Sequence, residues 1–226
     1  MLFRSNLLNV IPPKHNNSLT LSVLCFIAVA MLVTRRKIET INSKLSQDKH
    51  NVLLREFPPD MKEKFISSSE VWVVGVTLSR YMRDWYPYFE QKLRGEGCKI
   101  NVLLRDPDGE TVHLVAKHSY EEISSDQIRS TIRTTLGRLH NLKSISPNCL
   151  SIKTLDHPIS MGIFAFDPGK PNGVIYVEYN PYKGEEGSIP KLALSIKDEN
   201  WYYSYQKLLY SVWNSGEDWG DAGSSS

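Results

Sequence analysis

The chain has 226 residues and carries 27 Lys and Arg against 25 Asp and Glu, a formal net charge of +2. This near-neutral balance argues against a general nucleic-acid binder, which would carry a basic face or a run of cations interleaved with aromatic residues. A hydrophobic fraction of 41% and an aromatic fraction of 10% are typical of a folded protein, so we expect disorder only at the chain ends.

An uncharged apolar run covers residues 19–33, and three cations follow it at 35–37. A membrane-spanning helix needs about 17 to 25 mostly apolar residues, so the sequence predicts a transmembrane helix over residues 18–34, at the short end of that range. A cleaved signal peptide is the alternative, but such a peptide ends in small residues and this run ends in cations. The positive-inside rule then predicts a single-pass membrane protein, held in the membrane by residues 18–34, whose C-terminal domain is cytoplasmic.

Breaks in the apolar pattern divide the rest of the chain. Pro58 and Pro59 interrupt a thin apolar stripe that otherwise predicts a helix, because each proline disfavours helical geometry in the residue before it. The predicted segments are an N-terminal segment at 1–17, the transmembrane helix at 18–34, a linker helix at 35–56, an α/β domain at 57–214 and a disordered tail at 215–226.

The first half of the domain reads as a βαβ unit. After a short helix at 61–67, the β-branched apolar residues 71–77 predict a strand buried within a parallel sheet. Apolar residues at helical spacing predict a helix over 81–94, and a second buried strand follows at 99–105. The turn signal at 106–109 closes this unit.

The second half begins with a long helix and continues with strands. Apolar residues on one face predict a helix over 125–143, with Ser124 and Gln127 as its capping box. Strands are predicted at 150–155, 159–166, 174–179 and 191–196, with a hairpin connection at 167–173. A closing helix at 201–213 should pack on the sheet through a broad apolar face that consists of Trp201, Tyr205, Leu208, Leu209, Val212 and Trp213.

Motifs for metal, cofactor and disulfide chemistry are missing from the sequence. The domain contains two cysteines, Cys98 and Cys149, too few for a disulfide scaffold or a cysteine zinc site. The acidic residues Asp106, Asp108 and Glu110 are interpreted as a solvated turn in preference to a cation site. We therefore predict no metal and no cofactor.

The order of elements resembles one repeat of the phospholipase D-like superfamily. The resemblance covers about residues 55–214 and is carried by Ser67–Gly75 followed by Thr77 and Leu78, by Leu93–Pro107, and by the strand pair around Asp167. It implies an α/β/α sandwich with a mixed sheet, and pairing of two copies as a homodimer. The predicted fold is thus α/β, with one N-terminal transmembrane helix followed by a cytosolic phospholipase D-like sandwich.

Active members of that family use an H-x-K-x-x-x-x-D motif, in which the His attacks phosphorus and the Lys holds phosphate oxygens. Alignment of Asp167 with the motif Asp places Ser160 at the His position and Gly162 at the Lys position. A serine without a base is a poor nucleophile and glycine supplies no charge. Since no histidine in the chain is followed two residues later by lysine, we predict no catalytic residues.

Polar residues at the carboxyl ends of the predicted strands are the candidate ligand-binding residues, because ligands bind at that edge of open α/β sheets. They are Thr77, Ser79, Arg105, Asp106, Asp167 and Glu178. A pocket of this kind would recognise a nucleotide or another small polar ligand. The alternative is that Arg105 pairs with Asp167 or Glu178 and only satisfies buried charge.

Three functions remain open from the sequence. We expect a single-pass membrane protein with a non-catalytic cytosolic domain for ligand sensing or partner binding, an architecture that by analogy suits a bacterial stress or defence effector. One alternative is an atypical phosphodiesterase or nuclease that uses Ser160, Asp167 and Glu178. The other is a structural adaptor held at the membrane.

Overall fold

The computed structural model of the protein describes residues 24, 26–37, 52–119, 122–180, 183 and 190–220. The chain divides into two compact units, residues 1–50 and residues 51–226. Each unit is treated by itself below.

The described part of the first unit is a helix at residues 26–37. Residue 24 is helical as well, and the last three described residues of the helix, 35–37, are cations. Among all described residues, no helix has the length and apolar character needed to cross a membrane. The predicted transmembrane helix at 18–34 is therefore wrong for this structure; its residues 18–23 and 25, like the segment 1–17 and most of the predicted linker helix, lie outside the described residues.

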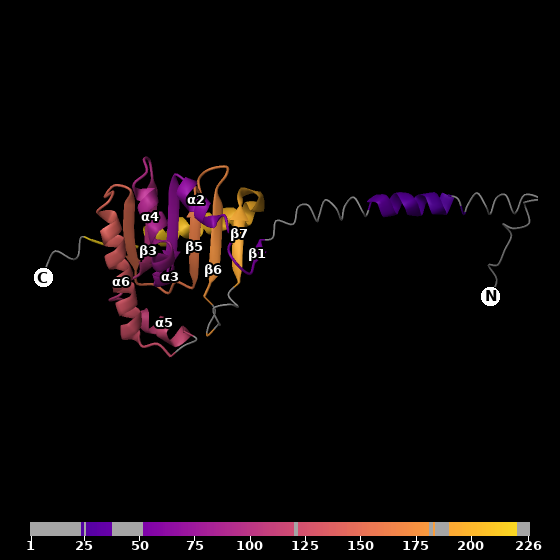
Figure 1. The fold of residues 1–226 in the computed structure, drawn as a ribbon. Coiled ribbons are helices and arrows are strands. Elements are labelled where there is room, and N and C mark those ends of the chain that lie inside the picture. Colours follow the sequence, from indigo (N-terminus) through magenta and orange to yellow (C-terminus); the bar gives the residue numbers. More distant parts are fainter. Residues whose placement is uncertain are drawn as a thin grey trace, which may run out of the picture. The chain divides into compact units, whose positions relative to one another are not determined.

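The second unit is built on one mixed sheet of eight strands (Figure 1). The strand order is β1-β7-β6-β5-β2-β3-β4-β8. Strands β2, β3 and β4 run parallel, and the other pairs of the described sheet are antiparallel. The strands are β1 (Leu53–Leu54), β2 (Glu70–Gly75), β3 (Lys99–Arg105), β4 (Leu150–Leu155), β5 (Met161–Phe166), β6 (Val174–Tyr179), β7 (Lys191–Ser195) and β8 (Glu217–Asp218).

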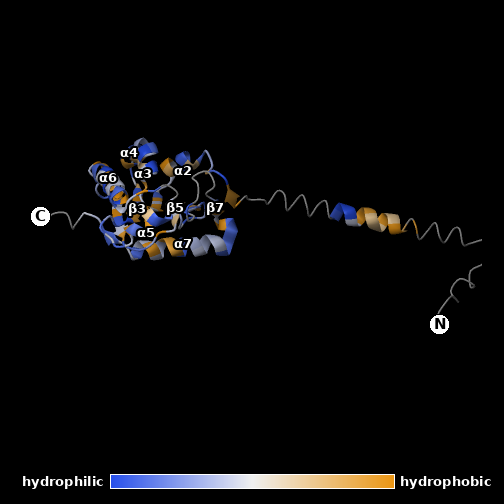
Figure 2. Cartoon of the chain, turned by 90° about the horizontal axis from the view of Figure 1, so that it is seen from below, coloured by the Kyte–Doolittle hydropathy of each residue, from blue (hydrophilic) through white to orange (hydrophobic). Residues whose placement is uncertain are grey.

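Helices cover both faces of this sheet. Figure 2 shows α2, α3, α4 and α6 on one side and α7 on the other. The helices are α2 (Met61–Ser67), α3 (Ser79–Asp84), α4 (Tyr86–Leu93), α5 (Val112–His118), α6 (Ser125–Lys143) and α7 (Glu199–Asn214), with a short 3-10 turn at Ile196–Asp198. The architecture is α/β with a mixed sheet, as the sequence predicts.

Two apolar clusters, one on each face, hold these layers together. Val71 and Val73 of β2 belong to the cluster beneath α2–α6, whereas Trp72 and Val74 belong to the cluster beneath α7. Successive residues of β2 are therefore buried on opposite faces. This explains why the sequence of this strand is continuously apolar instead of alternating.

Several predicted elements have the bounds that the structure shows, among them α2, β3, α6, β4 and β6. The capping box of α6 is formed, because Ser124 Oγ accepts from the Gln127 amide at 3.2 Å and Gln127 Oε1 accepts from the Ser124 amide at 2.8 Å. The helix predicted at 81–94 is instead two helices that meet at Trp85, because Pro87 occupies the first turn of a new helix. Helix α5 was not predicted.

The sheet also extends beyond the predicted domain. β1 lies in the segment assigned to the linker helix, and β8 lies in the segment assigned to the disordered tail. Each has two residues, too few for an alternating pattern to show in the sequence. The rest of that tail, residues 221–226, lies outside the described residues.

The apolar face of α7 is narrower than the sequence suggests. Tyr205 and Leu209 are buried against the sheet, but Trp201 is 67% exposed and Leu208 is 36% exposed. A single helix on the outer face of a sheet buries only the residues that point inward. The broad face predicted from the sequence is thus partly on the surface.

The two neighbouring leucines of α7 test this packing. Leu209→Ala should lower the free energy of unfolding by about 2–5 kcal/mol, because it removes a fully buried side chain and leaves a cavity. Leu208→Ala is the matched control on the same helix and should cost less than about 1 kcal/mol. Urea unfolding of the full chain measures both values, and equal losses would contradict the assigned inner face.

Candidate functional site

The six candidate ligand-binding residues lie at both ends of the sheet. Thr77 and Ser79 follow β2, and Arg105 and Asp106 lie at the end of β3, so these four are at the carboxyl end of the parallel strands. Glu178 joins this end, because it lies near the end of β6 and its register partner is Gly162 at the start of β5.

Asp167 is at the opposite end. It follows β5, which runs antiparallel to β2 with Val71 opposite Phe166, so it lies beside the beginning of β2. The six residues therefore do not line one pocket, and Ser160 and Gly162 at the start of β5 are also at the other end of that strand from Asp167.

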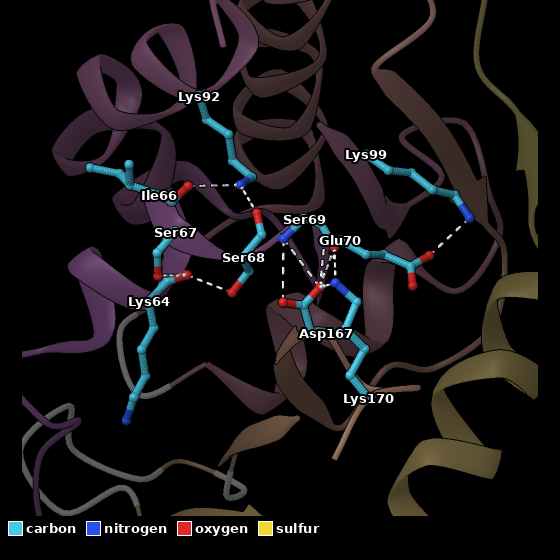
Figure 3. A network of polar contacts seen from close by, with 10 residues as sticks. All are labelled: Lys64, Ile66, Ser67, Ser68, Ser69, Glu70, Lys92, Lys99, Asp167 and Lys170. Carbon is cyan, nitrogen blue, oxygen red and sulfur yellow. Dashed lines mark hydrogen bonds and ion pairs between the residues drawn. The ribbon is translucent and has the colours of Figure 1, made fainter. Parts of the chain in front are cut away.

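The carboxylate of Asp167 closes the end of the β2–β5 pair (Figure 3). It accepts hydrogen bonds from the Ser69 amide at 3.1 Å, the Ser69 hydroxyl at 2.7 Å and the Glu70 amide at 2.9 Å. Lys170 Nζ forms an ion pair with it at 3.2 Å. Burial acts to raise the pKa of the Asp167 carboxyl, but the hydrogen bonds from Ser69 and Glu70 and the contact with Lys170 hold it below the usual value. This arrangement stabilises a loop.

Arg105 pairs with neither Asp167 nor Glu178. Its Nη1 donates to the Thr111 carbonyl at 2.7 Å and to Thr111 Oγ1 at 2.8 Å, and Thr111 Oγ1 donates in turn to Asp156 at 2.7 Å. The side chain is 2% exposed, and burial lowers the pKa of its guanidinium, against the opposing charge of Asp156. Arg105 thus anchors the loop that leads into α5.

Asp106 has a local role as well. Its Oδ1 accepts from the Asp108 amide at 2.8 Å and forms the turn that the sequence predicts. Asp108 forms an ion pair with Arg133 of α6. Within the described residues, no group of three or more His, Cys, Asp and Glu could hold a metal ion.

Glu178 is the centre of a polar cluster at the carboxyl end of β2. Its carboxylate is 7% exposed and accepts from Arg80 Nη2 at 3.0 and 3.1 Å and from the Tyr81 hydroxyl at 2.8 Å. Lys191 Nζ of the neighbouring strand β7 lies 3.6 Å from Oε1. A buried carboxylate is costly unless it is paired and hydrogen-bonded, and here three side chains provide those contacts.

A tight turn between β2 and α3 brings Arg80 and Tyr81 over Glu178. Leu78 adopts φ of 50°, in the left-handed region that few non-glycine residues occupy. A Cβ on Gly75 would lie 2.5 Å from Leu78 Cδ2, so a larger residue at position 75 would require the Leu78 side chain to shift. Thr77 Oγ1 and Ser79 Oγ share a hydrogen bond of 3.3 Å within the turn.

The same cluster forms one wall of an open cleft of about 510 Å³. The three side chains that contact Glu178, those of Arg80, Tyr81 and Lys191, also line this cleft. Its lining residues are the aromatic Phe57, Tyr81 and Trp85, the cations Lys62, Arg80 and Lys191, the acids Glu56 and Asp84, and Pro58, Pro59 and Met61. The cleft therefore combines aromatic surfaces with charged groups of both signs.

The described side chains of the cleft can bind a ligand through aromatic surfaces and charged groups. None of its described lining residues is Ser, Thr, Cys or His, the side chains that most often act as nucleophile or base. Burial and the carboxylate of Glu178 raise the pKa of Tyr81, so its phenol stays protonated and donates to Glu178. The polar groups here can orient a ligand.

Sequence reasoning found Glu178 but missed the residues that hold it. Arg80 and Tyr81 directly follow Ser79, so the rule that ligands bind at strand ends could have included them. Phe57 precedes α2 and Lys191 begins β7, so the sequence does not indicate that these two residues meet at the end of β2.

No protein-family model matches the chain, and no curated protein matches it either. What the cleft binds is therefore inferred from the chemistry of its own residues.

The role of Asp167 can be tested through pH. Because its folded pKa lies below the usual value of about 3.9, its contribution to stability is present above that pH and is lost as the pH falls through the folded pKa. Asp167→Asn, which tolerates the φ of 47° at this position, should lower the free energy of unfolding by about 1.5–3 kcal/mol at pH 7. The difference from the unmodified chain should shrink at pH 3.

Urea unfolding at pH 7 and pH 3 measures this difference. Asp108→Asn is the control, because the Asp108 side chain is 66% exposed and should contribute little. A stability loss in Asp167→Asn that is the same at both pH values would show that its charge is not what matters.

Proposed function

We propose that residues 52–220 form a non-catalytic ligand-binding domain of degenerate phospholipase D-like type, whose cleft takes a small ligand with a planar ring and an anionic group, as in a nucleotide. One observation carries this proposal: the buried carboxylate of Glu178 lies directly behind the cleft and orients Arg80 and Tyr81 on its wall.

Preorganisation supports a binding role for this cluster. Arg80 is held by Glu178 before any ligand arrives, yet its side chain remains 37% exposed at the cleft. Lys191 is held in the same way and also lies over the ring of Phe57, 5.5 Å from the ring centre. Side chains fixed in advance lose less conformational entropy when a ligand binds.

The aromatic residues of the cleft suit a planar ring. Phe57 packs edge-on against Phe164 and Tyr176, with ring centres 5.9 and 5.8 Å apart, so its own position is fixed. Trp85 and Tyr81 also pack edge-on, 5.9 Å apart. The cleft volume of about 510 Å³ falls within the range of small-molecule sites, about 300–1,000 Å³.

Cations at the cleft suit the anionic group of such a ligand. Lys62 lines the cleft near the start of α2 and has an exposed side chain, and Arg80 lines it from α3. Guanidinium and ammonium groups bind phosphate through charge-assisted hydrogen bonds.

The phosphodiesterase alternative has weaker support. It requires Ser160, Asp167 and Glu178 to act together, but Ser160 and Asp167 lie on either side of β5, seven residue steps or about 23 Å apart at roughly 3.3 Å per residue. Asp167 is also occupied by Ser69, Glu70 and Lys170. The degenerate phospholipase D-like type is proposed from the sequence resemblance, together with Ser160 and Gly162 at the positions of the motif His and Lys.

Nucleotide binding by the full chain is the first test. Against a panel of the four common nucleoside 5′-monophosphates, we expect at least one to raise the free energy of unfolding, by about 2.7 kcal/mol at a concentration 100-fold above its Kd. Isothermal titration calorimetry should give one site per chain. Lys62→Ala should weaken this binding about threefold to tenfold, because it removes one cation from the cleft wall and leaves the contacts of Glu178 in place.

Lys99→Ala is the matched control, because Lys99 is exposed and pairs with Glu70 at the opposite end of the sheet. Equal effects of the two lysine substitutions, or no binding by any of the four nucleotides, would contradict the proposal and favour the adaptor function. Hydrolysis of bis(p-nitrophenyl) phosphate that Glu178→Gln abolishes would instead establish a phosphodiesterase.

A further inference from the structure

The two cysteines of the second unit, Cys98 and Cys149, lie together although they are distant in the sequence. Cys98 directly precedes β3 and Cys149 directly precedes β4, and these parallel strands are neighbours, with Ile100 opposite Leu150. The Ile100 amide donates to the Cys149 carbonyl at 2.7 Å. The two thiols are free, half-buried and hydrogen-bonded to each other.

A buried cation lies beside this thiol pair. Lys92 of α4 is 4% exposed, and its ammonium group donates to the carbonyl oxygens of Ile66 and Ser68 (Figure 3). The ammonium group interacts electrostatically with both Cys98 and Cys149. Because a nearby positive charge favours the thiolate form of cysteine, this location is unlike that of an inert core thiol.

The two sulfur atoms differ in their environments. Hydrogen bonds from Cys98 and Ser146 lower the pKa of the Cys149 thiol, and Lys92 acts in the same direction. Burial and the neighbouring Cys149 raise the pKa of the Cys98 thiol to about 11. Lys92 favours the thiolate of both residues, but only Cys149 also accepts a hydrogen bond from Ser146, so Cys149 is the sulfur expected to react first and Cys98 the one expected to react second.

We propose that Cys98 and Cys149 are an oxidisable pair, which a hydroperoxide converts into an intramolecular disulfide between the beginnings of β3 and β4. The Cys149 thiolate attacks one peroxide oxygen, the O–O bond breaks, and Cys149 becomes a sulfenic acid while the other oxygen leaves and is protonated. The Cys98 sulfur then attacks the Cys149 sulfur, the S–O bond breaks, and the hydroxyl group leaves as water with the Cys98 proton. With hydrogen peroxide, two thiols are oxidised and one peroxide is reduced to two waters.

This inference goes beyond the proposed ligand binding and does not depend on it. The thiol pair is at the beginning of β3 and β4, whereas the cleft is at the carboxyl end of the neighbouring strand β2. Failure of the chain to bind nucleotides would therefore not bear on the oxidation of Cys98 and Cys149.

Peptide mapping of the full chain after oxidation tests the pair. The reduced protein is treated with hydrogen peroxide, the remaining thiols are blocked with N-ethylmaleimide, and the peptides are identified by mass spectrometry. We expect a peptide that joins Cys98 to Cys149 within one chain, and loss of the blocking group from both residues. Cys25, the third cysteine of the sequence, serves as the internal reference thiol.

Two variants separate the roles of the sulfur atoms. Cys98→Ser should leave Cys149 as a sulfenic acid that dimedone labels. In Cys149→Ser, dimedone should label Cys98 at least about tenfold less than it labels Cys149 in Cys98→Ser. Circular dichroism verifies that each variant is folded. The proposal is overturned if Cys98 and Cys149 both stay fully blocked at peroxide concentrations that oxidise Cys25, if the disulfides formed join Cys25 instead, or if both variants are labelled equally.

Discussion

The antiparallel pairing of β5 with β2 determines at which end of the sheet Asp167 and Glu178 lie. Val71 pairs with Phe166, so the end of β5 lies beside the beginning of β2 and the start of β5 lies beside the end of β2. The pairing of Gly162 with Glu178 then brings the end of β6 to the same place. Had β5 run parallel to β2, Asp167 would lie near Arg80 and Glu178 would lie among the serines before β2.

Three buried charges of the described domain have different kinds of partner, although Nε of Arg105 has no hydrogen-bond partner. Glu178 uses side chains from α3 and β7, Asp167 uses backbone amides and a serine hydroxyl, and Arg105 uses a threonine that leads to Asp156. The contacts of Asp167 and Arg105 include backbone groups and stabilise loops, and neither side chain lines the cleft. Only the Glu178 cluster is made of side chains that also line a cleft, which is why burial and charge alone do not identify a site.

Much of the fold could be predicted from the sequence, because its central elements carry strong local patterns. The apolar run of β3, interrupted by Asn101, and the capping box of α6 depend on neighbours in the chain. The two-residue strands β1 and β8 carry no such pattern, and the exposure of Trp201 depends on how far α7 wraps the sheet. The six candidate residues were grouped because each lies at or near the end of a predicted strand, but the sequence does not show that β5 runs antiparallel to β2. Asp167 was therefore assigned to an end of the sheet that it does not occupy.

Helix α2 contacts both the cleft and the ammonium group of Lys92. Its first residues, Met61 and Lys62, line the cleft, and the carbonyl oxygens of Ile66 and Ser68 at its other end hold the ammonium group of Lys92. Phe65, fully buried between them, fixes the helix against Trp85 and Phe89. A change at Lys92 therefore acts on the end of a short, well-packed helix whose beginning forms part of the cleft. The aromatic contacts of Phe65 hold the middle of α2 in the core, between the residues that line the cleft and those that hold Lys92.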